Sequence, residues 1–204
     1  VMKTRIINRI IALLLTMTGL ASCGLDLQEN YDYQASVSDP HVNMTAWEFF
    51  KSRPDLFSEL MQAVEYADME DYYTQTENMY TYLALSNTAM QSFRESNFPG
   101  AVSIIECDKE AVRELLLYHI VDGEYSSYGQ LQVDPMFVLT LLPGEYGLMT
   151  MSVRKNPWQA AVGQIVINST GSNSNSPMRT AKTSNILPVN GVIHVFDNYC
   201  YYKK

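Results

Sequence analysis

Cysteine and basic residues are scarce in this sequence. Its 204 residues include three cysteines, too few for a domain built on disulfide bonds. Lysine and arginine together number 14, against 22 aspartates and glutamates, which gives a formal net charge of −8. Proteins that bind nucleic acid carry a basic surface, so the composition argues against nucleic acid as a partner. Hydrophobic residues make up 47% of the chain, enough apolar material for the core of one domain.

Recognised catalytic and cofactor motifs are missing as well. No Gly-x-Ser-x-Gly turn, phosphate-binding loop or dinucleotide fingerprint occurs. The three histidines, His41, His119 and His194, lack the His-x-His or paired-cysteine spacing that would complete a zinc site. Acidic residues are numerous, but no two of them stand out as a glycosidase pair. We therefore expect no enzymatic activity, no bound metal and no cofactor.

The first 22 residues have the order of an export signal. Three cations precede a short apolar run at residues 10–15, and no acidic residue occurs before Asp26. That run is too short to span a bilayer. The segment ends in Leu20-Ala21-Ser22-Cys23, which resembles a bacterial lipobox. We expect cleavage before Cys23 and lipidation of its thiol; the alternative is an ordinary cleavable signal that happens to leave a cysteine.

The predicted mature chain consists of a lipidated tether at residues 23–44 and a domain at residues 45–204. Cleavage would remove three cations and no acid, leaving 11 lysines and arginines against 22 acidic residues and a net charge of −11. Such a charge disfavours docking of the domain on anionic lipid, so the anchor at Cys23 alone would hold it to the membrane. Gly24 is not the aspartate that commonly retains lipoproteins at the inner membrane. We expect an outer-membrane lipoprotein of the cell envelope, exposed at the cell surface.

Helix signals dominate the first half of the predicted domain. Thr45 and Glu48 have the spacing of a capping box, and Pro54 suits the first turn of a second helix. Phe57, Leu60, Met61 and Val64 then form one apolar stripe. Residues 87–93 and the segment from Asp108 to Tyr118 predict two further helices.

Strand signals dominate the second half. An early strand is predicted at residues 80–86, and later ones at residues 137–142, 147–153, 161–168 and 192–202. Residues 168–177 are rich in serine and asparagine and predict an exposed, mobile loop. Helices followed by strands indicate an α+β fold, mainly β, with a dominant antiparallel sheet.

Three stretches together resemble the fasciclin (FAS1) family. Residues 80–93 are similar to its first motif, residues 115–127 to its Tyr-His segment, and residues 190–197 to its second conserved motif. The resemblance extends over about residues 45–202. It implies a wedge of about seven strands with flanking N-terminal helices, and a role in adhesion or extracellular binding.

Five residues within these motifs are expected to be structural. His119 and His194 lie among apolar neighbours, where an unsatisfied ring would cost about 1–3 kcal/mol. Each ring should bond to backbone or to a nearby aspartate, and replacing either with alanine should lower thermal stability. Tyr118 lies on an apolar helix end, and Asn190-Gly191 marks a turn.

Tyrosines are the expected binding residues, because large side chains with few rotatable bonds dominate binding hot spots. The candidates are Tyr125 and Tyr128 after the Tyr-His segment, and Tyr72, Tyr73 and Tyr80 around the first motif. The partner would be an extracellular protein or a polysaccharide. An alternative hypothesis is an accessory surface lipoprotein of a glycan-binding and uptake system. Cys107 and Cys200 could pair after export or remain free thiols.

Overall fold

A computed structural model describes residues 39–156, 158, 163–169 and 176–200. The predicted signal segment, the lipidation site at Cys23 and most of the predicted tether therefore lie outside the described residues. The helices are α2 (Ala46–Ser52), α3 (Pro54–Tyr66), α4 (Glu70–Thr74), α5 (Asn87–Asn97) and α6 (Lys109–Tyr118). The strands are β1 (Tyr80–Leu85), β2 (Ile120–Asp122), β3 (Met136–Leu139), β4 (Leu148–Val153), β5 (Ile165–Ile167), β6 (Arg179–Thr180), β7 (Thr183–Ile186) and β8 (Gly191–Phe196).

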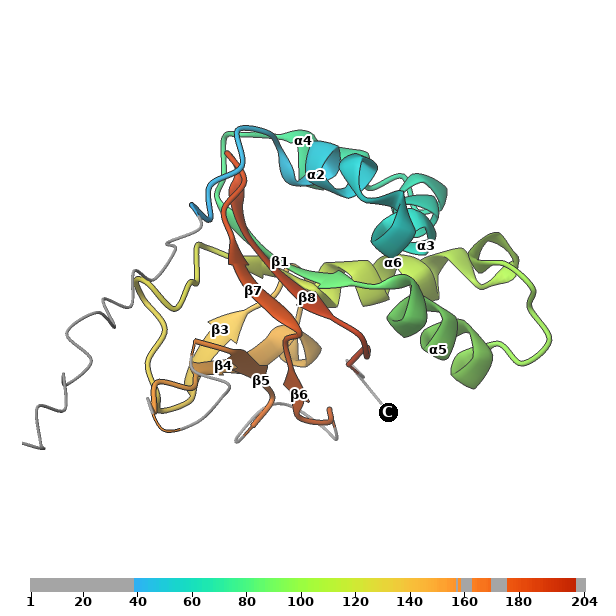
Figure 1. Cartoon of the computed structure of the whole chain (residues 1–204). Helices are drawn as coiled ribbons and strands as arrows, with labels where there is room; N and C mark the ends of the chain where they lie inside the picture. The colour runs from blue at the N-terminus through green and yellow to red at the C-terminus, as the bar shows by residue number, and fades with distance from the viewer. Residues whose placement is uncertain (1–38, 157, 159–162, 170–175, 201–204) are drawn as a thin grey trace, which may run out of the picture. The chain divides into compact units, whose positions relative to one another are not determined.

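These strands form two four-stranded sheets. Sheet 1 has the order β2-β1-β8-β7, and sheet 2 has the order β3-β4-β5-β6. An isolated bridge between Val121 and Thr140 joins the end of β3 to β2. Figure 1 shows α2, α3 and α4 along one side of β1 and β8, with sheet 2 on the other side. The predicted α+β class with N-terminal helices is confirmed.

Local sequence signals fix the starts of the helices. Thr45 and Glu48 form both bonds of the predicted capping box, and Pro54 occupies the first turn of α3. Asp108 caps α6 by accepting a hydrogen bond from the Ala111 N–H. The apolar side chains of these helices pack into an aromatic core in which the Phe50 and Phe57 rings lie 5.0 Å apart.

Parallel pairing of β1 with β8 forms the centre of sheet 1. The two strands come from opposite ends of the domain, and the register places Leu83 opposite His194. Gly191 makes the close approach possible: its φ is +148°, and a Cβ there would lie 1.8 Å from the Tyr80 carbonyl oxygen. The first and third sequence motifs are therefore neighbouring strands.

Pairing with this sheet starts before the predicted domain boundary at residue 45. The Val42 N–H donates to the Leu187 carbonyl, and the Leu187 N–H donates to the Pro40 carbonyl, each at 2.9 Å. Residues 40–44 thus continue the folded unit, which extends from Pro40 onward. No apolar pattern predicts this pairing, because the hydrogen bonds join backbone groups.

The prediction of an exposed loop at residues 168–177 is wrong at its two ends. Asn168 and Ser176 are buried, and both lie within hydrogen-bond distance of the Tyr118 hydroxyl, at 3.2 and 3.1 Å. Satisfaction of a buried phenol therefore outweighs the polar composition of these residues. Residues 170–175 lie outside the described part of the chain. Strands β2, β6 and β7 and helix α4 were not predicted, since each is five residues or fewer.

Two further features concern the cysteines and the membrane. Cys107 and Cys200 are free, buried thiols; their sulfur atoms lie near the Ser103 and Pro177 carbonyls respectively. None of the helices in the described residues is long and apolar enough to cross a bilayer.

Candidate binding surfaces

The segment after the Tyr-His motif is held in place by β7 and β8. His194 Nε2 lies 2.8 Å from the Tyr125 carbonyl oxygen. The Asn185 side chain accepts a hydrogen bond from the Ser127 N–H at 2.9 Å and donates one to the Ser127 hydroxyl at 2.8 Å. We call residues 123–128 the tyrosine loop. Its backbone conformation is thus fixed by side chains about 60 positions later in the sequence.

The bonds of His194 define its protonation. The Asn185 N–H donates to Nδ1 at 3.1 Å, so Nδ1 is an acceptor and Nε2 carries the proton that is donated to Tyr125. Burial lowers the pKa of His194 to about 4, and its bond to the Tyr125 carbonyl opposes that shift only in part. The ring is neutral at physiological pH, and both nitrogens are satisfied.

His119 is also neutral but uses the other tautomer. Its Nδ1 donates to the Leu115 carbonyl at 2.7 Å, and its Nε2 accepts from the Cys200 N–H at 3.3 Å. Burial lowers the pKa of His119 to about 4. Both rings are thus hydrogen-bonded to backbone groups and not to the nearby aspartates. No cluster of possible metal ligands occurs among the residues that the structure describes.

Asn190 connects the helical layer to sheet 1. Its side-chain oxygen accepts from the Ala46 N–H at the start of α2, at 2.9 Å. Its amide nitrogen lies 2.9 Å from the Tyr73 carbonyl, 3.0 Å from the Gln75 carbonyl and 3.0 Å from the Tyr82 hydroxyl. Asn190 is fully buried, so the side chain replaces water for backbone groups at the ends of α2 and α4.

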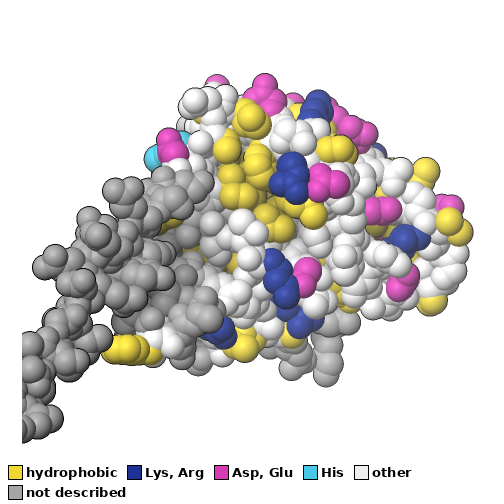
Figure 2. All heavy atoms as spheres, viewed as in Figure 1, with side chains coloured by type: hydrophobic (Ala, Val, Ile, Leu, Met, Phe, Trp, Pro, Cys, Tyr) yellow, Lys and Arg dark blue, Asp and Glu magenta, His cyan; other side chains and the backbone are white. Residues whose placement is uncertain are grey.

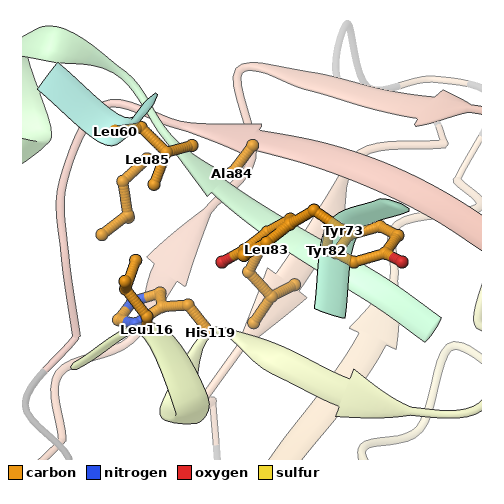
Figure 3. A pocket seen from close by; sticks show the side chains of 8 residues that line it. All are labelled: Leu60, Tyr73, Tyr82, Leu83, Ala84, Leu85, Leu116 and His119. Carbon is orange, nitrogen blue, oxygen red and sulfur yellow. The ribbon is translucent and has the colours of Figure 1, made fainter. Parts of the chain in front are cut away.

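The five candidate tyrosines differ in exposure. Tyr73 is 3% exposed and its ring stacks on Tyr82 with centroids 5.3 Å apart, so the prediction that it binds a partner is wrong. Figure 3 shows the two rings side by side in a space that does not admit a water molecule. Tyr72, Tyr80 and Tyr125 are half-buried against the core. Tyr128, at 69% exposure, is the one that projects into solvent.

Sequence reasoning missed a second surface, a groove of about 430 Å³ on sheet 2. Hydrophobic, basic and hydroxyl side chains line it: Val133, Pro135, Ser152, Val153, Arg154, Lys155, Asn156, Val166, Ser169 and Met178. One sequence signal could have located it. Residues 146–196 contain four cations and no acidic residue, although residues 39–145 hold 18 of the 22 acidic residues of the chain. The segment that forms most of sheet 2 therefore has a net positive charge within an acidic chain.

A further apolar region is visible on the face drawn in Figure 2. Hydrophobic side chains gather there between α2 and the strands β1 and β8, with basic and acidic side chains beside them. This is the edge of the core layer between the helices and sheet 1.

Comparison with known proteins agrees with this architecture. The family model of the fasciclin domain matches residues 55–200, and the chain belongs to this family. A FAS1 domain pair from the insect cell adhesion molecule Fasciclin I has a similar structure, with a TM-score of 0.53 and 17% sequence identity. The match covers 76% of this chain and 50% of that one, so this chain spans half the length of the insect structure. At that identity the likeness shows the fold alone. A comparison with curated protein sequences gave no match.

Fasciclin domains are adhesion-type, non-enzymatic domains. The chain accordingly contains a fasciclin-type domain over most of the residues that the structure describes.

Proposed function

We propose that this protein is a lipid-anchored component of the bacterial cell envelope that binds an extracellular partner through the tyrosine loop. The observation that carries the proposal is the contrast within this loop. Its backbone is fixed by His194 and Asn185, whereas Tyr128 is 69% exposed. A large side chain on an ordered backbone loses little conformational freedom on binding, which favours a hot spot.

The supporting sequence feature for anchoring is Leu20-Ala21-Ser22-Cys23 behind a basic and apolar lead. With the acidic tether that follows, a lipid on Cys23 would present the domain away from the membrane surface. Adhesion, as in the cell adhesion molecule with the similar fold, is the role we propose. The groove on sheet 2 favours a second candidate function, recognition of a glycan for uptake.

The binding role is tested with the purified full chain in a neutral detergent. Arrays of extracellular proteins and polysaccharides first identify what it binds, and the affinity is then compared between the unaltered chain and Tyr128→Ala. We expect at least tenfold weaker binding, about 1.4 kcal/mol, with an unchanged melting temperature. The double variant Tyr125→Ala/Tyr128→Ala should bind no more tightly than Tyr128→Ala.

Tyr146→Ala is the matched control. Tyr146 is 43% exposed and lies in the turn before β4, outside the tyrosine loop. The Tyr146→Ala variant should leave the affinity for the partner unchanged. Equal losses in Tyr128→Ala and Tyr146→Ala, or no loss in either, would contradict a role for the tyrosine loop.

A further inference from the structure

The groove on sheet 2 lies on the side of the sheet that faces away from the core. Along β4, Met149 and Met151 belong to the buried core, so the alternating Thr150 and Ser152 point to the opposite face. The strand register places Phe137 of β3 opposite Thr150 and Val166 of β5 opposite Ser152. This outer face is therefore continuous across three strands.

The walls of the groove combine apolar side chains with a small polar set. Val133 is 60% exposed and Met178 is 53% exposed, which is unusual for two hydrophobic side chains that line one groove. Ser169 Oγ is buried there and has no hydrogen-bond partner among the described residues, so a ligand hydroxyl or a similar group could satisfy it. Trp158 is 93% exposed and follows closely after the groove-lining Asn156, which accepts a hydrogen bond from the Trp158 N–H.

Two cations of the groove have no acidic partner within the described part of the chain. Arg154 makes a long side-chain contact of 3.5 Å to Gln164, and no ion pair to Arg154 or Lys155 occurs among the described residues. Other cations of the domain are paired, such as Lys109 with Asp68 and Lys182 with Asp197. Asp134 lies between the groove-lining Val133 and Pro135, but no ion pair joins it to either cation among the described residues. A ligand with a negative charge would supply the missing partner.

The strands of the groove exclude one mode of peptide binding. Strands β4 and β5, which form its floor, are paired on both sides, because the sheet order is β3-β4-β5-β6. An extended peptide cannot add to them as a further strand, since their backbone groups are already bonded. Recognition must then use side chains. Apolar side chains of the groove would contact C–H groups of the ligand, its hydroxyl side chains would bond ligand hydroxyls, and its cations would pair with a ligand anion.

We propose that this groove binds an anionic saccharide, a pyranose chain bearing carboxylate or sulfate groups. Arg154 and Lys155 bind the anionic group, Ser152 and Ser169 bind ring hydroxyls, and Val133, Val166 and Met178 contact the C–H faces of the sugars. The inference deepens the proposed function, because it assigns a chemical class to the polysaccharide partner and a surface other than the tyrosine loop.

The test is calorimetric titration of the purified full chain, in a neutral detergent, with four probes. These are an oligogalacturonide, a sulfated oligosaccharide, a neutral cello-oligosaccharide of equal length, and oligoglutamate. We expect binding of at least one anionic oligosaccharide, weakened by added salt, and at least tenfold weaker binding of the neutral one. The two anionic sugars distinguish carboxylate from sulfate as the preferred group.

Arg154→Gln/Lys155→Gln should weaken anionic saccharide binding at least tenfold. The control Lys109→Gln/Lys182→Gln removes the same charge from cations outside the groove and should change affinity less than threefold. Val133→Ser should also weaken binding, since it removes part of the apolar surface that lines the groove. All of these side chains are at least partly exposed, and circular dichroism verifies folding of each variant.

Several outcomes would overturn the proposal. These are equal binding of neutral and anionic sugars, equal losses in the two charge variants, preference for oligoglutamate, and inorganic sulfate competing as strongly as the oligosaccharide. The Tyr128→Ala variant distinguishes binding in this groove from binding at the tyrosine loop. It should leave oligosaccharide binding intact, so a failed tyrosine-loop prediction and a failed groove prediction give different results.

Discussion

The His194 ring donates a hydrogen bond from Nε2 to the Tyr125 carbonyl oxygen, 2.8 Å away and 69 positions earlier in the sequence. This contact joins β8, the last strand in the sequence, to the tyrosine loop. Because the Asn185 N–H occupies the other ring nitrogen, His194 cannot rotate without breaking two buried bonds. A residue that sequence reasoning assigned to structure thereby positions the loop that carries Tyr128.

Acidification should destabilise the domain through its two buried histidines. In the unfolded chain each ring binds a proton below its ordinary pKa of 6.5, whereas the folded pKa of His119 and of His194 is about 4. The unfolded state therefore binds more protons between those values, so stability is complete above pH 6.5 and falls as the pH drops toward 4. The expected loss is about 2 kcal/mol for each histidine between pH 7 and pH 5. Urea unfolding at the two pH values measures it.

His194→Gln supplies the control for this pH effect. Glutamine does not titrate, so the difference in unfolding free energy between pH 7 and pH 5 should shrink by about half. Carboxyl groups change little in that interval and contribute a small background. An unchanged pH dependence in His194→Gln and in His119→Gln would show that the rings are not the titrating groups.

Asn190→Ala should lower the free energy of unfolding by about 3 kcal/mol or more. The change leaves the Ala46 N–H and the Tyr73 and Gln75 carbonyls without their side-chain partner, and each unsatisfied buried group costs about 1–3 kcal/mol. Chemical denaturation measures the loss. Asn87→Ala is a matched control, because Asn87 bonds the α3 backbone at a more exposed position and should cost less. Equal losses would contradict the central role of Asn190.

Gly191→Ala should lower the free energy of unfolding more than the addition of one methyl group implies. The new Cβ would lie 1.8 Å from the Tyr80 carbonyl oxygen, and both atoms belong to paired backbone that cannot move without separating β1 from β8. We expect a loss of about 3 kcal/mol or failure to fold. Gly100→Ala is the comparison: Gly100 also has a positive φ, but nothing lies within 4 Å of its Cβ position. Thermal melting that ranks Gly100→Ala as the worse variant would refute the close-approach argument.

Cys23→Ala should release the protein from the membrane. The prediction depends on Leu20-Ala21-Ser22-Cys23, since the thiol is the acceptor of the lipid. Fractionation of cells and detergent partitioning measure the change, and metabolic labelling with a fatty acid should mark chains that keep Cys23 and should not mark Cys23→Ala. Cys200→Ser is a control for loss of a thiol elsewhere in the chain. Persistence of Cys23→Ala in the membrane fraction, with labelling retained, would contradict lipid anchoring at this residue.

Much of the fold could be predicted because its signals are local. The Thr45–Glu48 capping box and Pro54 each act within one helical turn, so neighbouring residues suffice to place a helix start. The apolar period of α6 likewise marks its buried face, and alternating β-forming residues mark β1. The strands β2, β6 and β7 have two to four residues, and no longer β-like run marks them as one did for the equally short β3 and β5.

The residue types available for binding follow from the amino-acid order alone, but three-dimensional packing sets which of them reach solvent. Tyr73 and Tyr128 are chemically alike, yet packing against Tyr82 buries the first and leaves the second exposed. The tautomers of His119 and His194 and the groove beside Arg154 depend on partners from other elements. Hydrogen bonds such as that of Asn190 with Tyr82 join residues 108 positions apart. No local pattern encodes such pairings, because they form only when chain folding brings distant segments into contact.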